Sequence, residues 1–379
     1  MTKGETKKRT ALFKKTGIDA PLLIVTLVLT VFGLIMMFSA SYANAIYMFG
    51  DGFYYIRNQI VWAAVGIAIM FVVSFVNYKI YHKAAWPLYI ISEILLVITL
   101  FMPALNNAKR WIIIGSFQFQ PSEITKFAVI ILFAHFIAIH PGRMKEFKYG
   151  YLQPMLILLS IAAIMLQQTH LSGTILIFLV GICMMFVGGT KVRWFGITLG
   201  VVVPLGVAFI AISKKMEYAI SRFQIWLDPF QDRTGDGHQT IQSLLAIGSG
   251  GLMGVGLGNS RQKHLYVPEP QNDFIFSIIC EELGFIGAAF VIILFLIFIV
   301  RGFAIAMKAR DKFSAMVAIG ITVQVGLQAF LNIAVVSNTI PNTGISLPFF
   351  SQGGTSLVML LAQVGVLLSI SRFSSVNKN

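Results

Sequence analysis

The sequence predicts an all-α integral membrane protein with ten transmembrane helices. Of its 379 residues, 57% are hydrophobic and only 12% are charged, and the mean hydropathy is +0.80. Soluble globular proteins carry about 25% charged residues. Apolar runs of about 20 residues, the length that a helix needs to cross the hydrocarbon core, recur along the chain. Its two cysteines, Cys183 and Cys280, lie inside such runs, which excludes a disulfide scaffold.

The apolar runs define the expected helices in order. Their predicted bounds are 21–43, 58–77, 85–103, 121–140, 152–168, 171–188, 193–213, 273–300, 314–337 and 353–371. Only Gln168, at the end of the fifth run, and Thr169 and His170 after it interrupt the apolar sequence before the sixth run, so a tight turn is expected there. The longest connection, about 214–272, falls between helices 7 and 8. Loops of that length without secondary structure of their own are usually functional.

The distribution of lysine and arginine predicts the orientation, because cytoplasmic loops retain these residues. With the N-terminus inside, 19 of the 29 basic residues fall on the inner side and 9 on the outer side. We therefore expect a basic cytoplasmic arm (1–20), a membrane domain (21–372) and a cytoplasmic tail (373–379), with 214–272 on the outer face. The net charge of +14 then reflects topology, which argues against a nucleic-acid partner.

Five charged residues fall inside the predicted spans, where each costs about 2.5–3.5 kcal/mol at mid-membrane on insertion scales. They are Glu93, Glu123, Lys126, Glu281 and Glu282. Glu123 and Lys126 stand three apart, hence on one helix face where they can pair. Two interpretations stay open: a buried ion pair that fixes helix packing, or a hydrated cavity for a polar head group. Because Lys126 is near the outer end of its span, the cavity would open outwards.

The eighth helix begins just after a double proline at 268–270, which lacks the N–H groups that a helix needs. Asn272 or Asp273 is then expected to cap the helix, which is the ordinary role for an Asp in this position. The alternative is a functional carboxylate at the outer membrane boundary. At 100° per residue, Glu281 lies about 80° around from Asp273 and about 12 Å deeper, with Glu282 on the opposite face. Asp273 and Glu281 are therefore expected to line one cavity.

Two outer segments have irregular composition. The glycine-rich stretch 248–258 lacks the strand and the Lys-Ser/Thr pair of known phosphate loops. Tight turns are expected there, with phosphate contact by backbone amides as the alternative, supported by Arg261 and Lys263 just after it. The last outer loop, 338–352, has prolines and glycines at membrane depth. Such backbone persists only against protein or a water-filled cavity, so this loop is expected to close the outer cavity.

Several motifs in this chain occur together in a known order. They are Arg110-Trp111, Gln120-Pro121-Ser122-Glu123 with Lys126, Leu227-Asp228-Pro229-Phe230, Gln242-Ser243 through Gly258, Gln262-Lys263, Pro268-Glu269 through Glu282-Leu283-Gly284-Phe285, and Leu347-Pro348-Phe349 through Gly353-Gly354-Thr355-Ser356. With them the chain resembles the SEDS family (shape, elongation, division and sporulation) of RodA- and FtsW-type proteins over about 20–372. The string 268–271 looks closer to division and sporulation members. The chain departs from the family at His170, where a Pro-Asp is expected before the Gly-Thr.

The resemblance implies ten transmembrane helices and a peptidoglycan glycosyltransferase that polymerises lipid II on the outer face of the bacterial cytoplasmic membrane. Asp273 matches the Asp of the family's large outer loop on which activity depends, and Glu123 and Lys126 match the polar pair of its central cavity. The implied partner is a class B penicillin-binding protein, a single-span transpeptidase. We expect it to pack on the outer helices around 273–300 and 314–337.

The chemistry of this reaction assigns roles to the polar residues. One inverting displacement converts an α-linked sugar diphosphate into a β-linked glycan, and a carboxylate general base, here Asp273, typically contributes about 10²–10⁴-fold. The leaving diphosphate needs positive charge from Arg, Lys or a divalent cation. Mg²⁺ or Mn²⁺ is a candidate that no motif fixes, and no organic cofactor is expected. The substrate-binding candidates are Arg110, Trp111, Glu123, Lys126, Arg222, Arg261, Lys263, Glu281, Ser351 and Gln352.

Two other functions stay open on the sequence alone. A flippase for a lipid-linked precursor would also need a polar cavity in the membrane, but it would work by alternating access. A non-catalytic scaffold that recruits a transpeptidase would tolerate charge-neutral substitutions in the cavity. Polymer formation from lipid II without energy input distinguishes the enzyme from both.

Overall fold

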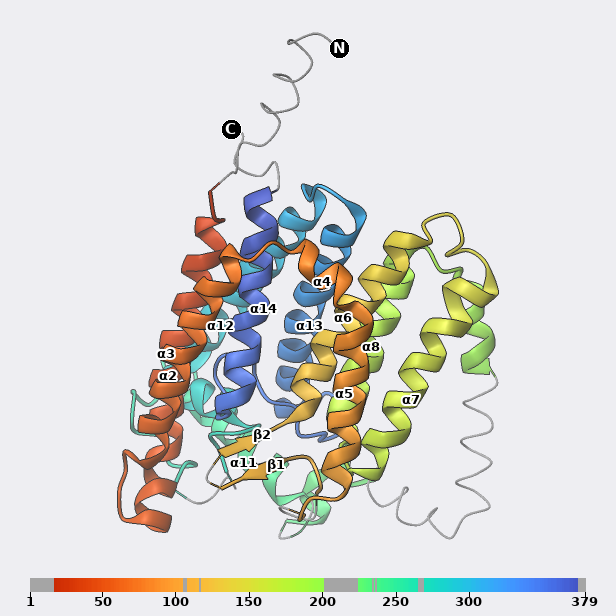
Figure 1. The fold of residues 1–379 in the computed structure, drawn as a ribbon. Helices are drawn as coiled ribbons and strands as arrows, with labels where there is room; N and C mark the ends of the chain where they lie inside the picture. The colour runs from red at the N-terminus through yellow and green to blue at the C-terminus, as the bar shows by residue number, and fades with distance from the viewer. Residues whose placement is uncertain are drawn as a thin grey trace, which may run out of the picture.

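The computed structural model describes residues 17–104, 108–115, 117–200, 224–233, 235, 237–264 and 269–373. Most of these residues lie in helices that run side by side as a bundle (Figure 1). The long helices are α2 (Ala20–Phe49), α3 (Tyr54–Phe75), α5 (Ala85–Leu100), α6 (Pro121–Ile139), α7 (Gln153–Gln167), α8 (Leu171–Gly188), α11 (His238–Gly250), α12 (Ile275–Met307), α13 (Lys312–Val336) and α14 (Gly354–Phe373). The short elements are α4 (Lys79–Lys83), the π-helix Phe147–Leu152, the 3₁₀ helix Pro229–Gln231, β1 (Ile112–Ile114) and β2 (Phe117–Phe119).

Eight helices in the described ranges are long and apolar enough to cross a membrane. The predicted span 171–188 coincides with α8, and most other predicted bounds differ from the observed ones by only a few residues. Helix α5 is apolar but shorter, and part of the predicted span 193–213 lies outside the described residues. The protein is therefore a nearly all-helical, multi-pass membrane protein, and the count of ten stays a prediction.

The first and last described helices are joined at one end of the bundle. The backbone N–H of Asp19, which caps α2, donates to the Ser371 hydroxyl in α14 at 3.2 Å. The Asp19 carboxylate also pairs with Arg301 of α12. The strands and α11 lie at the opposite end of the bundle (Figure 1), which we call the hairpin end. The predicted orientation would place the hairpin end outside the cell.

A small β-hairpin precedes α6, and the sequence analysis missed it. Strands β1 and β2 pair antiparallel, with Ile113 opposite Gln118. Gly115 follows β1 with φ +62°, a conformation that glycine adopts without strain. The hairpin carries the chain from Arg110 to the beginning of α6, so it determines where the first turn of α6 lies.

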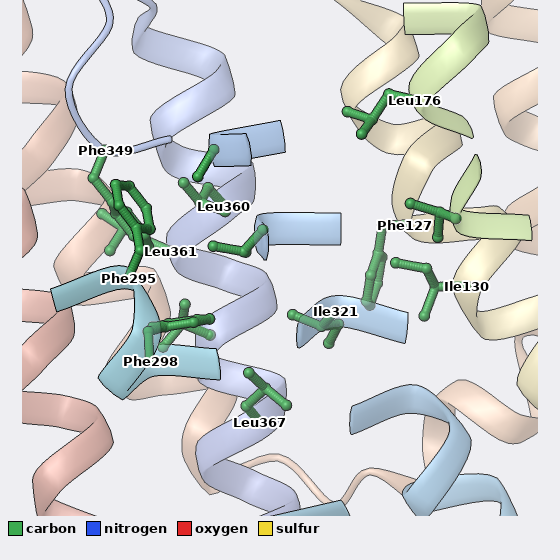
Figure 2. Packing of buried hydrophobic residues seen from close by; sticks show 14 of the residues in the cluster. Phe127, Ile130, Leu176, Phe295, Phe298, Ile321, Phe349, Leu360, Leu361 and Leu367 are labelled. Atoms are coloured by element: carbon green, nitrogen blue, oxygen red, sulfur yellow. The ribbon is translucent and has the colours of Figure 1, made fainter. Parts of the chain in front are cut away.

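The loop before α14 is built into the apolar core. Phe349 lies beside Phe295 and Phe298 of α12 in Figure 2, with ring centroids 6.5 and 6.0 Å away. On the α2 side, a Cβ on Gly33 would lie only 2.2 Å from the Phe349 carbonyl oxygen, so the two backbones touch. The irregular segment thus packs against protein on this side, and its residues 344–349, 351 and 352 also line the cavity described below.

Helix α12 is interrupted at Gly284, whose φ of 65° and ψ of −163° are not helical. The glycine-rich stretch packs into this break. A Cβ on Gly284 would lie 2.3 Å from the Gly254 nitrogen, and the Val255 N–H donates to the Glu281 carbonyl at 2.9 Å. Four glycines of the stretch have positive φ, as the expected tight turns require, and Gly251 at the end of α11 is the first of them. The other three are Gly254, Gly256 and Gly258.

Candidate functional site

A polar cavity of about 1010 Å³ opens at the hairpin end. Its walls come from the beginnings of α3, α6, α8 and α14, from the middle of α13, and from the β-hairpin, the segment before α12 and the loop before α14. Five charged side chains line it: Arg110, Glu123, Lys126, Glu269 and Asp273. The cavity therefore collects charges from segments that are far apart in the sequence.

Asp273 lies in the cavity wall and does not cap the helix that follows. The N-cap of α12 is Phe274, which makes no side-chain capping bond, so the expected helix-cap role is wrong. No group within the described ranges donates a hydrogen bond to the Asp273 carboxylate. The pKa of this carboxyl is raised to about 6. Burial is the largest cause; the charge of Arg110 lowers the pKa, and the charge of Glu269 raises it. A carboxylate that is ionised at neutral pH, yet more basic than usual, suits a general base.

The backbone at Asp273 is fixed by Asn332 of α13, which the sequence analysis did not single out. The Asn332 amide is fully buried and donates to the carbonyl of Asp273 at 2.7 Å and to that of Ile345 at 2.6 Å. Gly344 lies against the carboxylate, since a Cβ there would be 3.1 Å from Asp273 Oδ2. One buried amide thus holds the catalytic candidate and the loop before α14 together.

Glu123 and Lys126 form the ion pair that their spacing predicts. The Lys126 ammonium lies 2.8 Å from Glu123 Oε1, and both side chains are about nine-tenths buried. Gln328 of α13 accepts a longer contact of 3.5 Å from Lys126, and its own amide donates to the Ser346 carbonyl at 3.1 Å. Both members of the pair also line the cavity, so the ion pair is present in a cavity wall, and the binding of a polar head group there stays a prediction.

Arg110 and Trp111 reach the cavity from the segment before β1. Arg110 Nη2 donates to the Thr169 carbonyl at 2.6 Å, which ties this segment to the turn between α7 and α8. His170, the residue at which the chain departs from the resemblance, follows immediately and lines the cavity. The charge of Arg110 acts on both His170 and Asp273.

Ser351 and Gln352 line the cavity and connect its walls. The Ser351 hydroxyl donates to the Asn272 carbonyl at 2.6 Å and accepts the N–H of Leu347 at 2.7 Å. The backbone N–H of Gln352 donates to the Gln271 carbonyl at 2.9 Å. These bonds attach the loop before α14 to the segment that carries Asp273.

Glu281 does not share the cavity with Asp273, so that geometric expectation is wrong. The Glu281 carboxylate accepts the Ser260 hydroxyl and, at 2.8 Å, the backbone N–H of Arg261. Helical counting from Asp273 failed because Asp273 precedes the helix, which begins at Ile275. These hydrogen bonds to the Glu281 carboxylate hold the segment that follows the glycine-rich stretch.

The basic residues of that segment also lie outside the cavity lining. The ammonium of Lys263 is buried, 2.9 Å from Glu282 Oε1, and contacts the hydroxyl of Ser39 at 3.2 Å. Arg261 is exposed. The structure thus gives Lys263 a packing contact with α12 and α2 where a substrate contact was expected. Arg222 lies outside the described residues.

No three His, Cys, Asp or Glu side chains in the described part of the chain are grouped closely enough to hold a metal ion. The residues of the cavity therefore do not by themselves fit a resident Mg²⁺ or Mn²⁺. The expected divalent cation stays a prediction, and no step below is derived through it.

The FtsW/RodA/SpoVE family model, described as "Cell cycle protein", matches residues 20–376. The chain belongs to this family. It is 41% identical over 368 residues to stage V sporulation protein E of Bacillus subtilis, covering 95% of this chain and 99% of that protein. It is 39% identical to the probable peptidoglycan glycosyltransferase FtsW of a Geobacter species, covering 94% and 97%.

Solved structures of this family share the fold. A chain from a peptidoglycan synthase complex, reported for its coordination of polymerization and crosslinking, superposes with a TM-score of 0.77 at 27% identity, covering 94% of this chain and 98% of that one. The rod shape determining protein RodA of Thermus thermophilus superposes with a TM-score of 0.69 at 25% identity and the same coverage. The resemblance inferred from the motifs is confirmed.

Proposed function

We propose that this FtsW/RodA/SpoVE-family protein is a peptidoglycan glycosyltransferase that polymerises lipid II on the outer face of the bacterial cytoplasmic membrane. The observation that carries the proposal is the Asp273 carboxylate, free of hydrogen bonds within the described ranges, in a polar cavity that Arg110 and Lys126 also line. It is supported by 39% identity to a protein named as a probable peptidoglycan glycosyltransferase.

In the proposed reaction, an acceptor sugar hydroxyl attacks the anomeric carbon of a lipid-linked donor. The new C–O bond forms as the bond between that carbon and the diphosphate oxygen breaks, with inversion. Asp273 takes the hydroxyl proton, and the diphosphate leaves with the bonding electron pair. Arg110 and Lys126 supply positive charge for the leaving group, since fixed charges in a water-poor site stabilise developing charge well.

The partner we propose is a class B penicillin-binding protein. The structural relative from a synthase complex that combines polymerization with crosslinking supports it. We place its single span against α12 and α13, where apolar side chains such as Val300 and Phe330 are about two-thirds exposed.

The arm 1–20 and the tail 373–379 are assigned to the cytoplasm by the distribution of basic residues. Identities to SpoVE and FtsW proteins favour a division or sporulation role.

The test is polymerisation by purified protein in liposomes. Lipid II is supplied on the accessible face, without ATP or an ion gradient, with and without the co-purified transpeptidase. We expect glycan strands, and more of them with the partner. Transfer of lipid II across the bilayer without polymer would instead support the flippase, and neither activity, with normal recruitment of the transpeptidase, would support the scaffold.

A further inference from the structure

The wall of the cavity formed by α6, α8 and the segment before β1 carries two basic side chains and an imidazole, and Glu123 of α6 pairs with one of the basic side chains, Lys126. Arg110, Lys126 and His170 all line it, although they come from three separate elements. The bond from Arg110 to the Thr169 carbonyl, 2.6 Å long, brings its guanidinium to the residue just before His170. Lys126 lies one turn into α6.

His170 is held by its backbone and by packing. Its N–H donates to the Met165 carbonyl at 3.1 Å, and its carbonyl accepts the Thr174 N–H at 3.2 Å. The imidazole packs on Gly173, where a Cβ would lie 2.8 Å from Nε2. The side chain is only 7% exposed, and its Nδ1 is buried without a partner among the described residues. An imidazole fixed in this way has hydrogen-bonding capacity left for a ligand.

Two helices begin at this wall with uncapped first turns. The N-cap residues are Gln120 for α6 and His170 for α8, and neither makes a side-chain capping bond. Ser122, in the first turn of α6, lines the cavity, is 2% exposed, and has no partner for its hydroxyl within the described ranges. Unsatisfied N–H groups and the helix dipole both favour an anion at such positions. The buried, unpartnered Ser122 and His170 side chains independently indicate a ligand there.

The charge state of His170 depends on what the cavity holds. Burial, and then the charges of Arg110 and Lys126, lower its pKa to about 3, so the imidazole is neutral when no anion is present. A diphosphate brings several negative charges to the same wall and reverses the sign of the local field. The other charged groups that line the cavity are Glu123 on α6 and the Glu269 and Asp273 carboxylates before α12; their charges are negative, like that of the diphosphate.

We propose that Arg110, Lys126 and His170 form a subsite for the diphosphate of a lipid-linked sugar donor, and that His170 takes a proton from solvent as the diphosphate binds. The inference rests on the proposed function, which supplies the diphosphate. Neutral imidazole plus one proton gives imidazolium, a further donor to the leaving group beside the guanidinium and the ammonium. His170 is then a binding residue of the donor, and Asp273 remains the base.

Calorimetry on the full-length protein in detergent tests proton uptake directly. Geranylgeranyl diphosphate is the probe, and titrations in two buffers of different ionisation enthalpy give the protons taken up per ligand. We expect the wild-type protein to take up more protons than His170→Asn. Ionisation of the probe is common to both proteins and cancels in the difference. Equal proton uptake by both, with both folded, overturns the proposal.

Affinity provides a second readout. We expect His170→Asn to weaken diphosphate binding about tenfold near pH 6.5, which is the order of one charge-assisted hydrogen bond. The difference in affinity between wild type and His170→Asn should shrink towards pH 8.5, because the bound imidazolium then loses its proton. His170→Gln should behave like His170→Asn. Inorganic pyrophosphate should show the same pattern if the diphosphate alone is recognised, whereas geranylgeranyl monophosphate should bind more weakly and take up fewer protons.

The failures of the two proposals are distinguishable. If lipid II is polymerised while His170→Asn binds the probe as well as wild type at every pH, the subsite is wrong and the function stands. If the probe binds with His170-dependent proton uptake while no polymer forms from lipid II, the subsite stands and the proposed reaction is wrong.

Discussion

The side-chain amide of Asn332 donates a 2.7 Å hydrogen bond to the backbone carbonyl of Asp273. A second bond of 2.6 Å from the same nitrogen holds Ile345. The backbone position of the proposed base, just before α12, thus depends on a residue of α13. Asn332 does not line the cavity, so we treat it as a positioning residue.

Replacing Asn332 should affect turnover more than substrate affinity. Asn332→Ala removes two buried hydrogen bonds, each worth about 0.5–1.5 kcal/mol net, and lets the Asp273 segment move. We expect kcat to fall at least tenfold, with KM for lipid II within about twofold, in a polymerisation assay. Gln363→Leu is the control. Gln363 also has a buried side-chain amide, but it does not line the cavity, and its amide atoms have no hydrogen-bond partner within the described ranges. A variant whose KM rises while its kcat stays at the wild-type value would contradict the positioning role.

The Glu123–Lys126 pair should separate stability from binding. Lys126→Met leaves a buried carboxylate uncompensated, which commonly costs about 3–5 kcal/mol, so its Tm should fall. Adding Glu123→Gln should restore much of the Tm. Diphosphate binding should stay lost in the double variant, because the cation is gone in both. Recovery of binding together with Tm would show that Lys126 acts only through the fold.

The Lys263–Glu282 pair is a matched comparison outside the cavity. It has the same residue types, a 2.9 Å contact and nearly complete burial. Lys263→Met should lower the Tm, and adding Glu282→Gln should restore much of it, for the same electrostatic reason. In this case the restored protein should bind diphosphate normally. Persistent loss of binding in a stable Lys263→Met, Glu282→Gln protein would return Lys263 to the substrate site.

The pH profile should report the Asp273 carboxyl. Because its pKa is raised to about 6, polymerisation should increase as pH rises through about 6 and level off above it. Removing the Arg110 charge removes an interaction that lowers this pKa. Arg110→Gln should therefore shift the acidic limb to higher pH, whereas Arg110→Lys should not. An acidic limb that does not move in Arg110→Gln would argue against Asp273 as the group that titrates.

Hydrophobic length made most of the fold predictable. The span at α8 was predicted to the residue and that at α13 to within two, because a membrane imposes about 20 apolar residues on each helix. The β-hairpin and the break at Gly284 were missed. Both depend on contacts between segments: β1 needs β2 as a partner, and Gly284 is non-helical where Gly254 packs against it.

The site was predictable where function and local spacing coincide. The i,i+3 spacing of Glu123 and Lys126 predicts a pair within one helix, and that pair is present. The partner of Lys263 lies 19 residues away on α12, and its contact with Ser39 of α2 spans 224 residues. No pattern in the sequence specifies such contacts. Asn332 was missed for the same reason, since a single amide in an apolar span gives no sign of what it bonds.

The central claim, that Asp273 is the general base of a glycan polymerase, is tested most directly by Asp273→Asn. The change keeps the side chain's size and removes its basicity, so we expect polymerisation of lipid II in liposomes to fall about 10²–10⁴-fold. Tm, partner co-purification and diphosphate binding should stay near wild type. Asp51→Asn is the control, a partly exposed carboxylate paired with Arg57 at 3.0 Å and expected to leave the rate unchanged. Wild-type rates of glycan synthesis by folded Asp273→Asn protein would contradict the claim.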